Sequence, residues 1–274
     1  MKIDFTAILF EFIGIGVNGF CPLASGSKGN ALFLGTEQTR ILIDAGLSAA
    51  QVEKKLGEIG VSLDTIQAIL ITHEHTDHIK AVPQLAEKWK IPVLANAETA
   101  KSIVSSLNCR PRFKIFTTGE PFSFGDLEVL PFSIPHDTPD PVAFRIRTPK
   151  HTLGICADLG YATSLVRKML ERCDFLYLEA NHQPSMVHAC ARPAVYKERV
   201  LGRQGHLSNE ACAELLKSLA HEALLHVYLA HLSSECNSEE LAIKIVKEAL
   251  SQTVSRANLS IAYQDRISTP VLFR

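Results

Sequence analysis

The chain has 274 residues, of which 46% are hydrophobic and 21% are charged, an ordinary composition for a globular protein. Its 28 lysines and arginines nearly balance its 29 aspartates and glutamates, which leaves a formal net charge of −1. A charge so close to zero excludes a global attraction to nucleic acid or anionic lipid, so either partner would have to bind a local patch.

We interpret residues 1–18 as an apolar leader or first strand, followed by a single domain over 19–274. Glu11 interrupts the apolar run and Phe20 precedes Cys21, which argues against a signal peptide with a small-residue cleavage site. The run is also too short and too interrupted to span a bilayer, and no other segment reaches that length. We therefore expect no membrane partner.

Apolar runs with β-branched residues alternate with helical patterns along most of the chain. In the first part, the expected strands lie at 31–35, 40–46, 67–72 and 91–95. The helices expected there lie at 48–60, 79–89 and 97–107. The middle, 127–158, is rich in strands, and strand–helix units follow it, with a last helix near 238–250. This order predicts an α/β layered domain.

Seven cysteines are scattered singly, without any C-x-x-C pair: Cys21, Cys109, Cys156, Cys173, Cys190, Cys212 and Cys236. An odd number cannot all pair within one chain. Free thiols in a reducing compartment are the simplest interpretation, so we expect a cytoplasmic protein.

The strongest chemical signal is the hexapeptide HEHTDH at 73–78, directly after the buried run AILIT. Three imidazoles and the carboxylate of Asp77, all within six residues, can converge on a metal such as zinc. Alternate residues of an extended segment share a face, so His73 and His75 can reach one ion. Asp77 and His78, past the turn, can reach a second.

This hexapeptide is the hallmark of the metallo-β-lactamase superfamily, which the rest of the chain resembles in order. Segments from LASGSKGNA (23–31) to HLSSECNSEELA (231–242) resemble the YycJ/WalJ group of that superfamily. The resemblance implies the four-layer αββα fold, a β-sandwich flanked by helices. It also implies a metal-dependent nuclease, generally described as a 5′→3′ DNA exonuclease. The sequence departs from the group at Gln183 and in ARPAVYKERVLG (191–202).

The same resemblance implies roles for four residues outside the hexapeptide, each at the end of an apolar run. Asp44 would support the histidine loop without touching metal, and His136 would complete the first ligand set. Asp158 would bridge both ions, and His231 would be the last ligand of the second. The metals would be two divalent ions, Zn²⁺ or Mn²⁺.

His206, in the segment GHLSN, has two interpretations. It could simply belong to a loop that caps a helix near 208–220 through Ser208 or Asn209. By similarity to RNA-processing members of the superfamily, it would instead donate a proton to the leaving oxygen. Glu179 would then hold its imidazole, and His182 is a competing candidate for the proton donor.

The loop Ser25-Gly26-Ser27-Lys28-Gly29-Asn30 joins two early strands. Its glycines let backbone amides approach an anion, and Ser25, Ser27, Lys28 and Asn30 add polar groups, so a phosphate could bind there. A plain hairpin connection is the alternative. Basic clusters that could follow a nucleic-acid backbone lie at 110–114, 145–150 and 197–203.

We therefore expect a dinuclear metal-dependent phosphodiesterase, a 5′→3′ DNA exonuclease, in which a metal-bridging hydroxide attacks phosphorus. Asp77 would both bind metal and orient the nucleophile. The alternatives are a small-molecule ester or thioester hydrolase and an RNA phosphodiesterase on the same metal site. A di-iron oxidoreductase is disfavoured because such members carry Glu at the position of His75.

Overall fold

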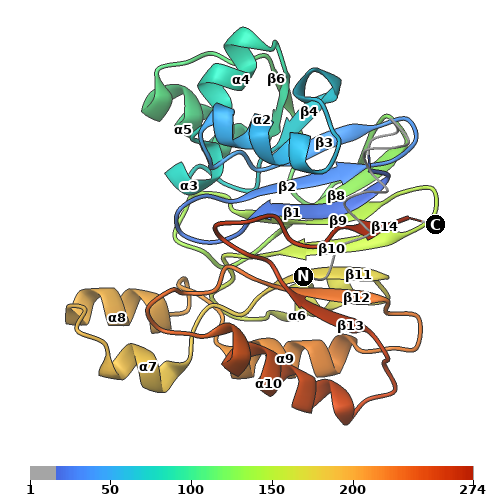
Figure 1. Ribbon diagram of the computed structural model, residues 1–274. Coiled ribbons are helices and arrows are strands. Elements are labelled where there is room, and N and C mark those ends of the chain that lie inside the picture. Colours follow the sequence, from blue (N-terminus) through green and yellow to red (C-terminus); the bar gives the residue numbers. More distant parts are fainter. Residues whose placement is uncertain (1–16, 274) are drawn as a thin grey trace, which may run out of the picture.

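The structure is a computed structural model that describes residues 17–273. Two seven-stranded sheets lie face to face, with helices on their outer faces (Figure 1). The predicted leader, apart from Val17 and Asn18, lies outside the described residues. All seven cysteines are free, as expected. Within 17–273, no helix is both long enough and apolar enough to cross a membrane.

The first sheet carries the N-terminal half of the chain and the last strand, in the order β14-β1-β2-β3-β4-β5-β6. Its strands are β1 (Gly19–Ala24), β2 (Ala31–Gly35), β3 (Arg40–Ile43), β4 (Ala68–Leu70), β5 (Val93–Ala95), β6 (Phe113–Ile115) and β14 (Val271–Leu272). From β3 to β6 neighbouring strands run parallel. Helices make the connections between these parallel strands, as a parallel pair requires.

The second sheet has the order β13-β12-β11-β10-β9-β8-β7. Its strands are β7 (Phe122–Phe124), β8 (Leu127–Ser133), β9 (Val142–Arg147), β10 (Thr152–Cys156), β11 (Phe175–Glu179), β12 (His226–Ala230) and β13 (Asn258–Ile261). The four strands from β10 to β13 run parallel. Most are buried on both faces, which is typical of parallel strands covered by helices.

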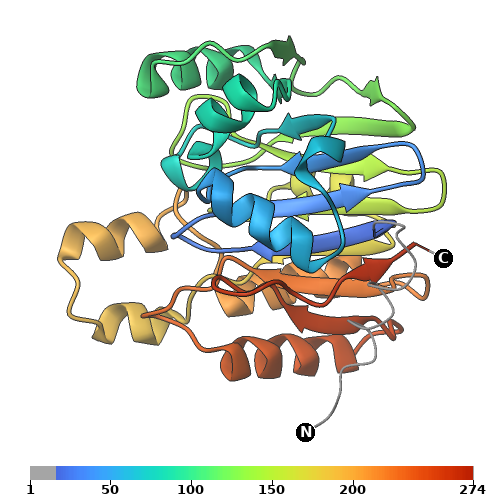
Figure 2. The ribbon, with the colours of Figure 1, turned by 45° about the horizontal axis from the view of Figure 1, so that its top comes forward.

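Helices fall into two groups along the chain. Those of the first half are α2 (Ala49–Glu58), the 3₁₀ turn η1 (Leu63–Thr65), α3 (Thr76–Ile79), α4 (Val82–Lys88) and α5 (Ala97–Leu107). Those of the second half are α6 (Ser164–Leu170), α7 (Pro184–Ala189), α8 (Ala194–Leu201), α9 (Asn209–Leu219) and α10 (Glu239–Ser251). Figure 2 shows α7 and α8 projecting from the body of the protein.

Three hydrophobic clusters define the layers. One packs the outer face of the first sheet against its helices and includes Val52, Leu85 and Ile103. A second, which includes Leu216 and Val246, does the same for the second sheet. The third lies between the sheets, where Phe20 meets Tyr177 and Tyr228 edge to face. The expected four-layer αββα arrangement is confirmed.

The expected helix over 79–89 forms as two short helices, α3 and α4. α3 begins at Thr76, three residues before the expected start, with His75 at its N-cap position. Asp77 and His78 therefore lie in a helical turn. Pro83 lies in the first turn of α4, the position where a helix tolerates proline. The split places the last residues of the 73–78 motif in a separate helical turn, away from the direction of β4.

Candidate metal centre

The motif at 73–78 leaves the end of β4, where the chain turns into α3. The turn packs closely against the segment after β3: a Cβ atom on Gly46 would lie 1.5 Å from the carbonyl oxygen of Asp77. The amide of Asn30 donates to that same carbonyl at 2.7 Å. Glycine at position 46, which has no Cβ atom, allows this close approach. The segments that contain Gly46 and Asn30 together fix the direction of the turn.

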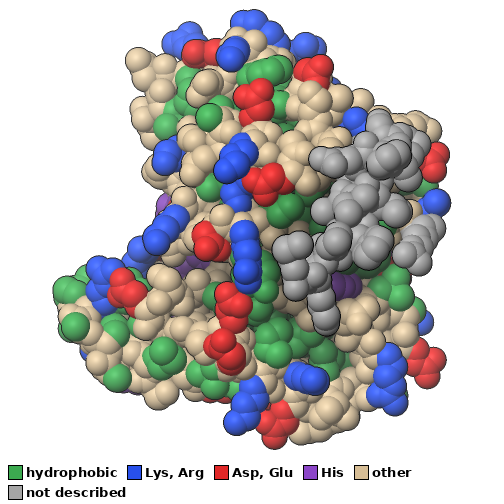
Figure 3. Space-filling model, in the orientation of Figure 1, with side chains coloured by type: hydrophobic (Ala, Val, Ile, Leu, Met, Phe, Trp, Pro, Cys, Tyr) green, Lys and Arg blue, Asp and Glu red, His purple; other side chains and the backbone are tan. Residues whose placement is uncertain are grey.

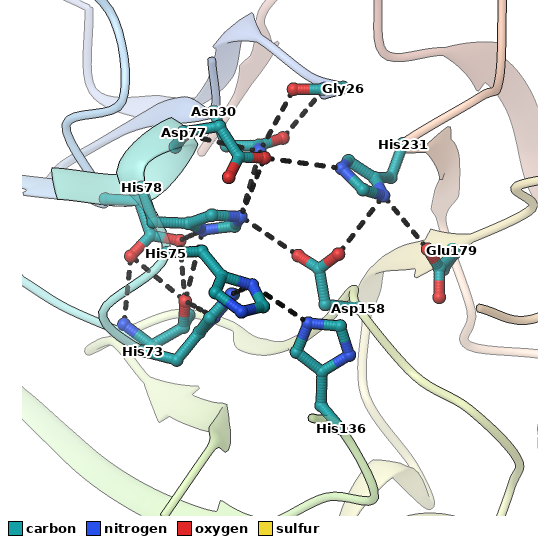
Figure 4. Close-up of polar contacts among 12 residues, drawn as sticks. Gly26, Asn30, His73, His75, Asp77, His78, His136, Asp158, Glu179 and His231 are labelled. Atoms are coloured by element: carbon teal, nitrogen blue, oxygen red, sulfur yellow. Dashed lines mark hydrogen bonds and ion pairs between the residues drawn. The ribbon is translucent and has the colours of Figure 1, made fainter. Parts of the chain in front are cut away.

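Three imidazoles converge beside this turn. Nε2 of His73 lies 3.1 Å from Nδ1 of His75, and Nε2 of His136 lies 3.3 Å from the same Nδ1 (Figure 4). Nitrogen ligands about 2.0–2.1 Å from a tetrahedral zinc ion would be roughly 3.3 Å apart. The spacing of these three nitrogens therefore fits a single metal ion, and burial lowers the pKa of His73 and His136, which favours the neutral, ligating imidazole.

A second group forms on the other side of Asp158. Asp77, His78 and His231 offer ligand atoms that all lie within 4.8 Å of one another. Oδ2 of Asp158 lies 3.0 Å from Nε2 of His78, and its Oδ1 lies 3.2 Å from Nδ1 of His231. Figure 4 shows the Asp158 carboxylate pointing between His78 and His231, with His136 on its other side.

Two buried atoms support a metal-binding role for this second group. Oδ2 of Asp158 and Nε2 of His231 make no hydrogen bond with any residue in 17–273, although Oδ2 is close to His78. Buried polar atoms without a partner are costly in a folded protein. A bound cation would satisfy both of them, so the donor set fits the divalent ions that the sequence predicts.

The protonation of this group follows from its buried carboxylates. Burial opposes the charged imidazole, but Asp44 and Asp158 raise the pKa of His78 well above its usual range. Burial likewise opposes protonation of His231, while Asp158, Asp77 and Glu179 raise its pKa to about 10. The negative field that holds these protons would equally attract a divalent cation, which displaces them when it binds.

Three residues at this edge adopt left-handed backbone conformations although none is glycine. They are Asp44, Asp158 and His231, with φ of 59°, 53° and 54°. Each follows a strand: β3, β10 and β12, respectively. Such conformations cost on the order of 1 kcal/mol or more, and they cluster at functional sites where the surrounding structure imposes them. Here they turn three acidic or imidazole side chains toward a common centre.

Asp44 contacts the centre indirectly, at the position that the resemblance implied. Its Oδ2 lies 2.8 Å from Nδ1 of His78, and its Oδ1 accepts a hydrogen bond from the amide of Thr72 at 2.9 Å. The Thr72 hydroxyl also lies 2.9 Å from Oδ2. Asp44 thereby sets the ring orientation of His78 and leaves Nε2 facing Asp158, as carboxylates behind metal-binding histidines do.

Glu179 is a fully buried carboxylate that holds two histidines at once. Its Oε1 lies 2.8 Å from Nδ1 of His206 and 3.0 Å from Nδ1 of His231. Its Oε2 accepts hydrogen bonds from the amides of Leu159 and Leu207. Burial opposes ionisation, yet His206 and His231 lower the pKa of Glu179 to about 2. The sequence indicated the His206 contact but not the one with His231.

His206 lies at the rim of the centre. Its ring centroid is 5.6 Å from that of His136 and 5.2 Å from that of His231. The same loop caps α9, because Ser208 accepts from the amide of Ala211. The capping interpretation is therefore confirmed, and the role of His206 as a proton donor stays a prediction. The competing His182 is buried, and its Nδ1 has no hydrogen-bond partner among residues 17–273. Glu179 therefore holds His206, not His182.

The loop at 25–30 borders the centre, but its four polar side chains differ in exposure. The buried hydroxyl of Ser25 lies 2.6 Å from that of Tyr177 and accepts from the amide of His231 at 2.8 Å. The Asn30 side chain is buried and contacts Gly26, Asp77 and His78. Ser25 and Asn30 are thus committed to supporting the centre, and Ser27 and Lys28 are the two that face solvent.

The arginines of the predicted basic clusters also differ in their contacts. Arg145 donates to the carbonyl oxygens of Met169 and Glu171, and Arg147 pairs with Glu128. Arg199 is close to the centre: its Nε donates at 2.7 Å to Asp137, whose other oxygen lies 3.4 Å from Nε2 of His136. Figure 3 shows a hollow between the upper half of the protein and the lobe of α7 and α8, with histidines inside and basic side chains around it.

Comparison with known proteins adds family and fold to this geometry. Residues 39–231 match the family model described as "Beta-lactamase superfamily domain". The chain is 34% identical over 236 residues to "Exodeoxyribonuclease YycJ" of Bacillus anthracis, which covers 85% of this chain and 89% of that protein. It is also 34% identical over 234 residues to "Exodeoxyribonuclease WalJ" of Streptococcus pneumoniae, covering 84% and 87%.

Among solved structures, the metallo-β-lactamase fold protein YhfI from Bacillus subtilis superimposes with a TM-score of 0.69. The match covers 91% of this chain and 98% of that one at 16% identity. Similarity at this level of identity establishes the fold, which is the metallo-β-lactamase fold. The arrangement of the two sheets and their helices agrees with it.

Proposed function

The chain belongs to the metallo-β-lactamase superfamily and is a metal-dependent hydrolase, and from this premise we propose that it is a dinuclear phosphodiesterase that degrades DNA from the 5′ end. The observation that carries the proposal is the position of Asp158, which lies close to members of both ligand sets. Ligand atoms of Asp158, His73 and His78 all lie within 4.8 Å of one another, and Oδ1 of Asp158 lies 3.2 Å from Nδ1 of His231. This carboxylate would bridge two ions, one held by His73, His75 and His136. The other would be held by Asp77, His78 and His231.

Two divalent ions, Zn²⁺ or Mn²⁺, would lower the pKa of a water molecule and offset the charge that develops on the phosphate. The protein supplies the rest. Asp77, whose Oδ2 lies 3.6 Å from Nε2 of His78, would orient the attacking water. Glu179 holds Nδ1 of His206, so the opposite ring nitrogen, Nε2, is free to deliver a proton to the leaving oxygen.

The substrate class rests on the relatives. Two proteins named exodeoxyribonucleases share 34% identity with this chain over most of both lengths. Two basic side chains support a nucleic-acid substrate, because Arg199 lies close to the centre and Lys28 is exposed on the loop that borders it. With a net charge of −1, binding would depend on such local contacts, and affinity should fall steeply with salt.

The decisive experiment compares end-labelled linear DNA with a covalently closed circle of the same sequence, using metal-loaded protein. We expect release of mononucleotides from the 5′ end of the linear DNA, faster when that end carries a phosphate, and no cleavage of the circle. Equal cleavage of both would show an endonuclease instead. Faster hydrolysis of RNA, or of a simple carboxylic ester with both DNA molecules intact, would favour the corresponding alternative.

A further inference from the structure

A cavity of about 590 Å³ opens next to the proposed metal centre. Its walls come from helix α8 and from the loops that contain three residues of the centre, His136, Asp158 and His206. The charged and aromatic residues that line it are Asp137, Tyr161, Glu198, Arg199 and Arg203. A volume in the range of roughly 300–1,000 Å³ is typical of sites that hold a small organic ligand.

The cavity is connected to the centre through Asp137 and Arg199. Oδ1 of Asp137 lies 3.6 Å from Nε2 of His75, and its Oδ2 accepts from Nε of Arg199 at 2.7 Å. Within residues 17–273, the two Nη atoms of Arg199 have no hydrogen-bond partner of their own. They are therefore free to bind an anion directly beside the metal-binding histidines, in the geometry that suits a phosphate.

The opposite wall carries an arginine stacked on a tyrosine. The guanidinium of Arg203 lies 4.4 Å from the ring centroid of Tyr161, a residue that is 37% exposed. Gly160 makes this pairing possible, because a Cβ atom there would lie 2.1 Å from the carbonyl oxygen of Arg203. In the described part of the chain, the Arg203 side chain makes neither a hydrogen bond nor an ion pair.

The formal charge of this lining is balanced, since Asp137 and Glu198 offset Arg199 and Arg203. Net charge therefore does not select a ligand for the cavity. What distinguishes it is a flat, solvent-facing surface of Tyr161 and Arg203 at one end and free guanidinium donors of Arg199 at the other. A planar base attached to a phosphate matches both ends, because bases stack on aromatic rings and on arginine.

We propose that this cavity binds the 5′-terminal nucleotide of the DNA strand, with its base against Tyr161 and Arg203 and its 5′-phosphate on Arg199. This inference rests on the proposed function. Water adds to the phosphorus that joins the first two nucleotides, the bond from phosphorus to the 3′-oxygen breaks, and that oxygen takes the proton of His206. The terminal nucleotide leaves with a 3′-hydroxyl, and the shortened strand keeps a 5′-phosphate.

The position of the cavity agrees with this chemistry. The leaving oxygen belongs to the terminal nucleotide, so this nucleotide must lie on the side of the proton donor. His206 follows directly on Gln204 and Gly205, which line the cavity, and its ring lies 5.6 Å from that of His136. A cavity of this size on this side would admit one nucleotide at a time, which favours removal of single nucleotides.

The test is equilibrium binding of 2′-deoxyadenosine 5′-monophosphate to the metal-loaded full-length protein, with inorganic phosphate as the second probe. We expect Tyr161→Ala and Arg203→Ala to weaken nucleotide binding about 5- to 100-fold, the usual effect of losing one stacking partner. Phosphate binding should change little, and Tyr161→Phe should restore nucleotide binding. Arg192→Ala removes a matched arginine, which lies over Tyr196 outside the cavity, and should have no effect.

The inference is overturned if wild-type protein binds the nucleotide no better than phosphate, or if Tyr161→Ala and Arg203→Ala both bind it as wild type does. In either case the proposed function still stands provided that linear DNA is degraded from its 5′ end. Conversely, wild-type protein could leave linear DNA intact while Tyr161→Ala loses nucleotide binding. That result would support the nucleotide site and reject the exonuclease. The two proposals therefore fail by different results.

Discussion

Oε1 of Glu179 lies 2.8 Å from Nδ1 of His206, and the same oxygen lies 3.0 Å from Nδ1 of His231. One buried carboxylate oxygen therefore orients both the proposed proton donor and a proposed metal ligand. Because two backbone amides fix the other oxygen, the carboxylate has little freedom to move. A change of His206 should therefore affect the rate alone, whereas a change of Glu179 should affect both the rate and metal binding.

Replacing His206 with Ala should slow hydrolysis by about 10²–10⁴-fold, the usual contribution of a positioned general acid. Because His206 is not among the proposed metal ligands, the variant should still bind two metal ions. Metal analysis and single-turnover rates on linear DNA check both expectations. Normal activity in this variant would remove His206 from the mechanism, and loss of metal would make it a ligand.

Replacing Glu179 with Gln should impair both metal binding and rate. The amide keeps the size of the side chain but removes the negative charge that His206 and His231 share. We therefore expect a metal content below that of His206→Ala and a rate no higher than that of His206→Ala. Competition with a chelator measures the metal affinity. A Glu179→Gln variant with full metal content would show that its contact with His231 has no role in ligation.

Asp44 should affect metal affinity without touching the metal. Its contact with Nδ1 of His78 fixes the ring, and removal of such a partner typically costs about 10–100-fold in metal affinity or activity. We expect Asp44→Ala to lose that much affinity in a chelator competition, and Asp44→Asn, which keeps a hydrogen-bonding group, to lose less. Lys247→Ala, on the distant helix α10, is a suitable control. Equal affinity in all three variants would contradict the role of Asp44.

His226, far from the centre on β12, should make stability depend on pH. Burial lowers its pKa from 6.5 to about 4, so between these values the unfolded chain binds a proton that the folded chain does not. The stability that is present above 6.5 is therefore lost as the pH falls toward 4.

We compare how much unfolding free energy each protein loses when the pH is lowered from about 7.5 to about 5. We expect this loss to be roughly 1–2 kcal/mol smaller in His226→Asn than in wild type. Urea unfolding at both pH values measures this difference. His188→Asn, at an exposed position on α7, provides the control. Like His226→Asn it removes one histidine, and the histidines other than His188 and His226 are the same in both variants. Parallel losses in His226→Asn and wild type would contradict the assignment.

Much of the fold was predictable from the sequence, because the alternation of apolar runs and amphipathic stretches is local information. The expected strands at 31–35, 40–46, 67–72 and 91–95 correspond to β2, β3, β4 and β5. The short helices α7 and α8 were not anticipated. They bury few apolar side chains, so neither has a strong hydrophobic period.

The proposed ligand set came from the hexapeptide and from the family resemblance, whereas the supporting contacts came from the structure. The hydroxyl of Ser25 supports His231 across 206 residues of sequence, and Asp137 pairs with Arg199 across 62. Contacts between loops that meet only in the folded chain leave no local pattern. This is why Ser25 and Asn30 were expected at a phosphate pocket, although the structure buries both beneath the centre.

The central claim, that two metal ions at this centre drive phosphodiester hydrolysis, is tested most directly by titrating the chelator-treated protein with Mn²⁺ or Zn²⁺. Bound metal and the rate of nucleotide release from linear DNA are followed in the same samples. The account predicts no release without metal and a rate that levels off at two bound ions per chain. Full activity in the metal-free protein, or a plateau at one ion per chain, would contradict it.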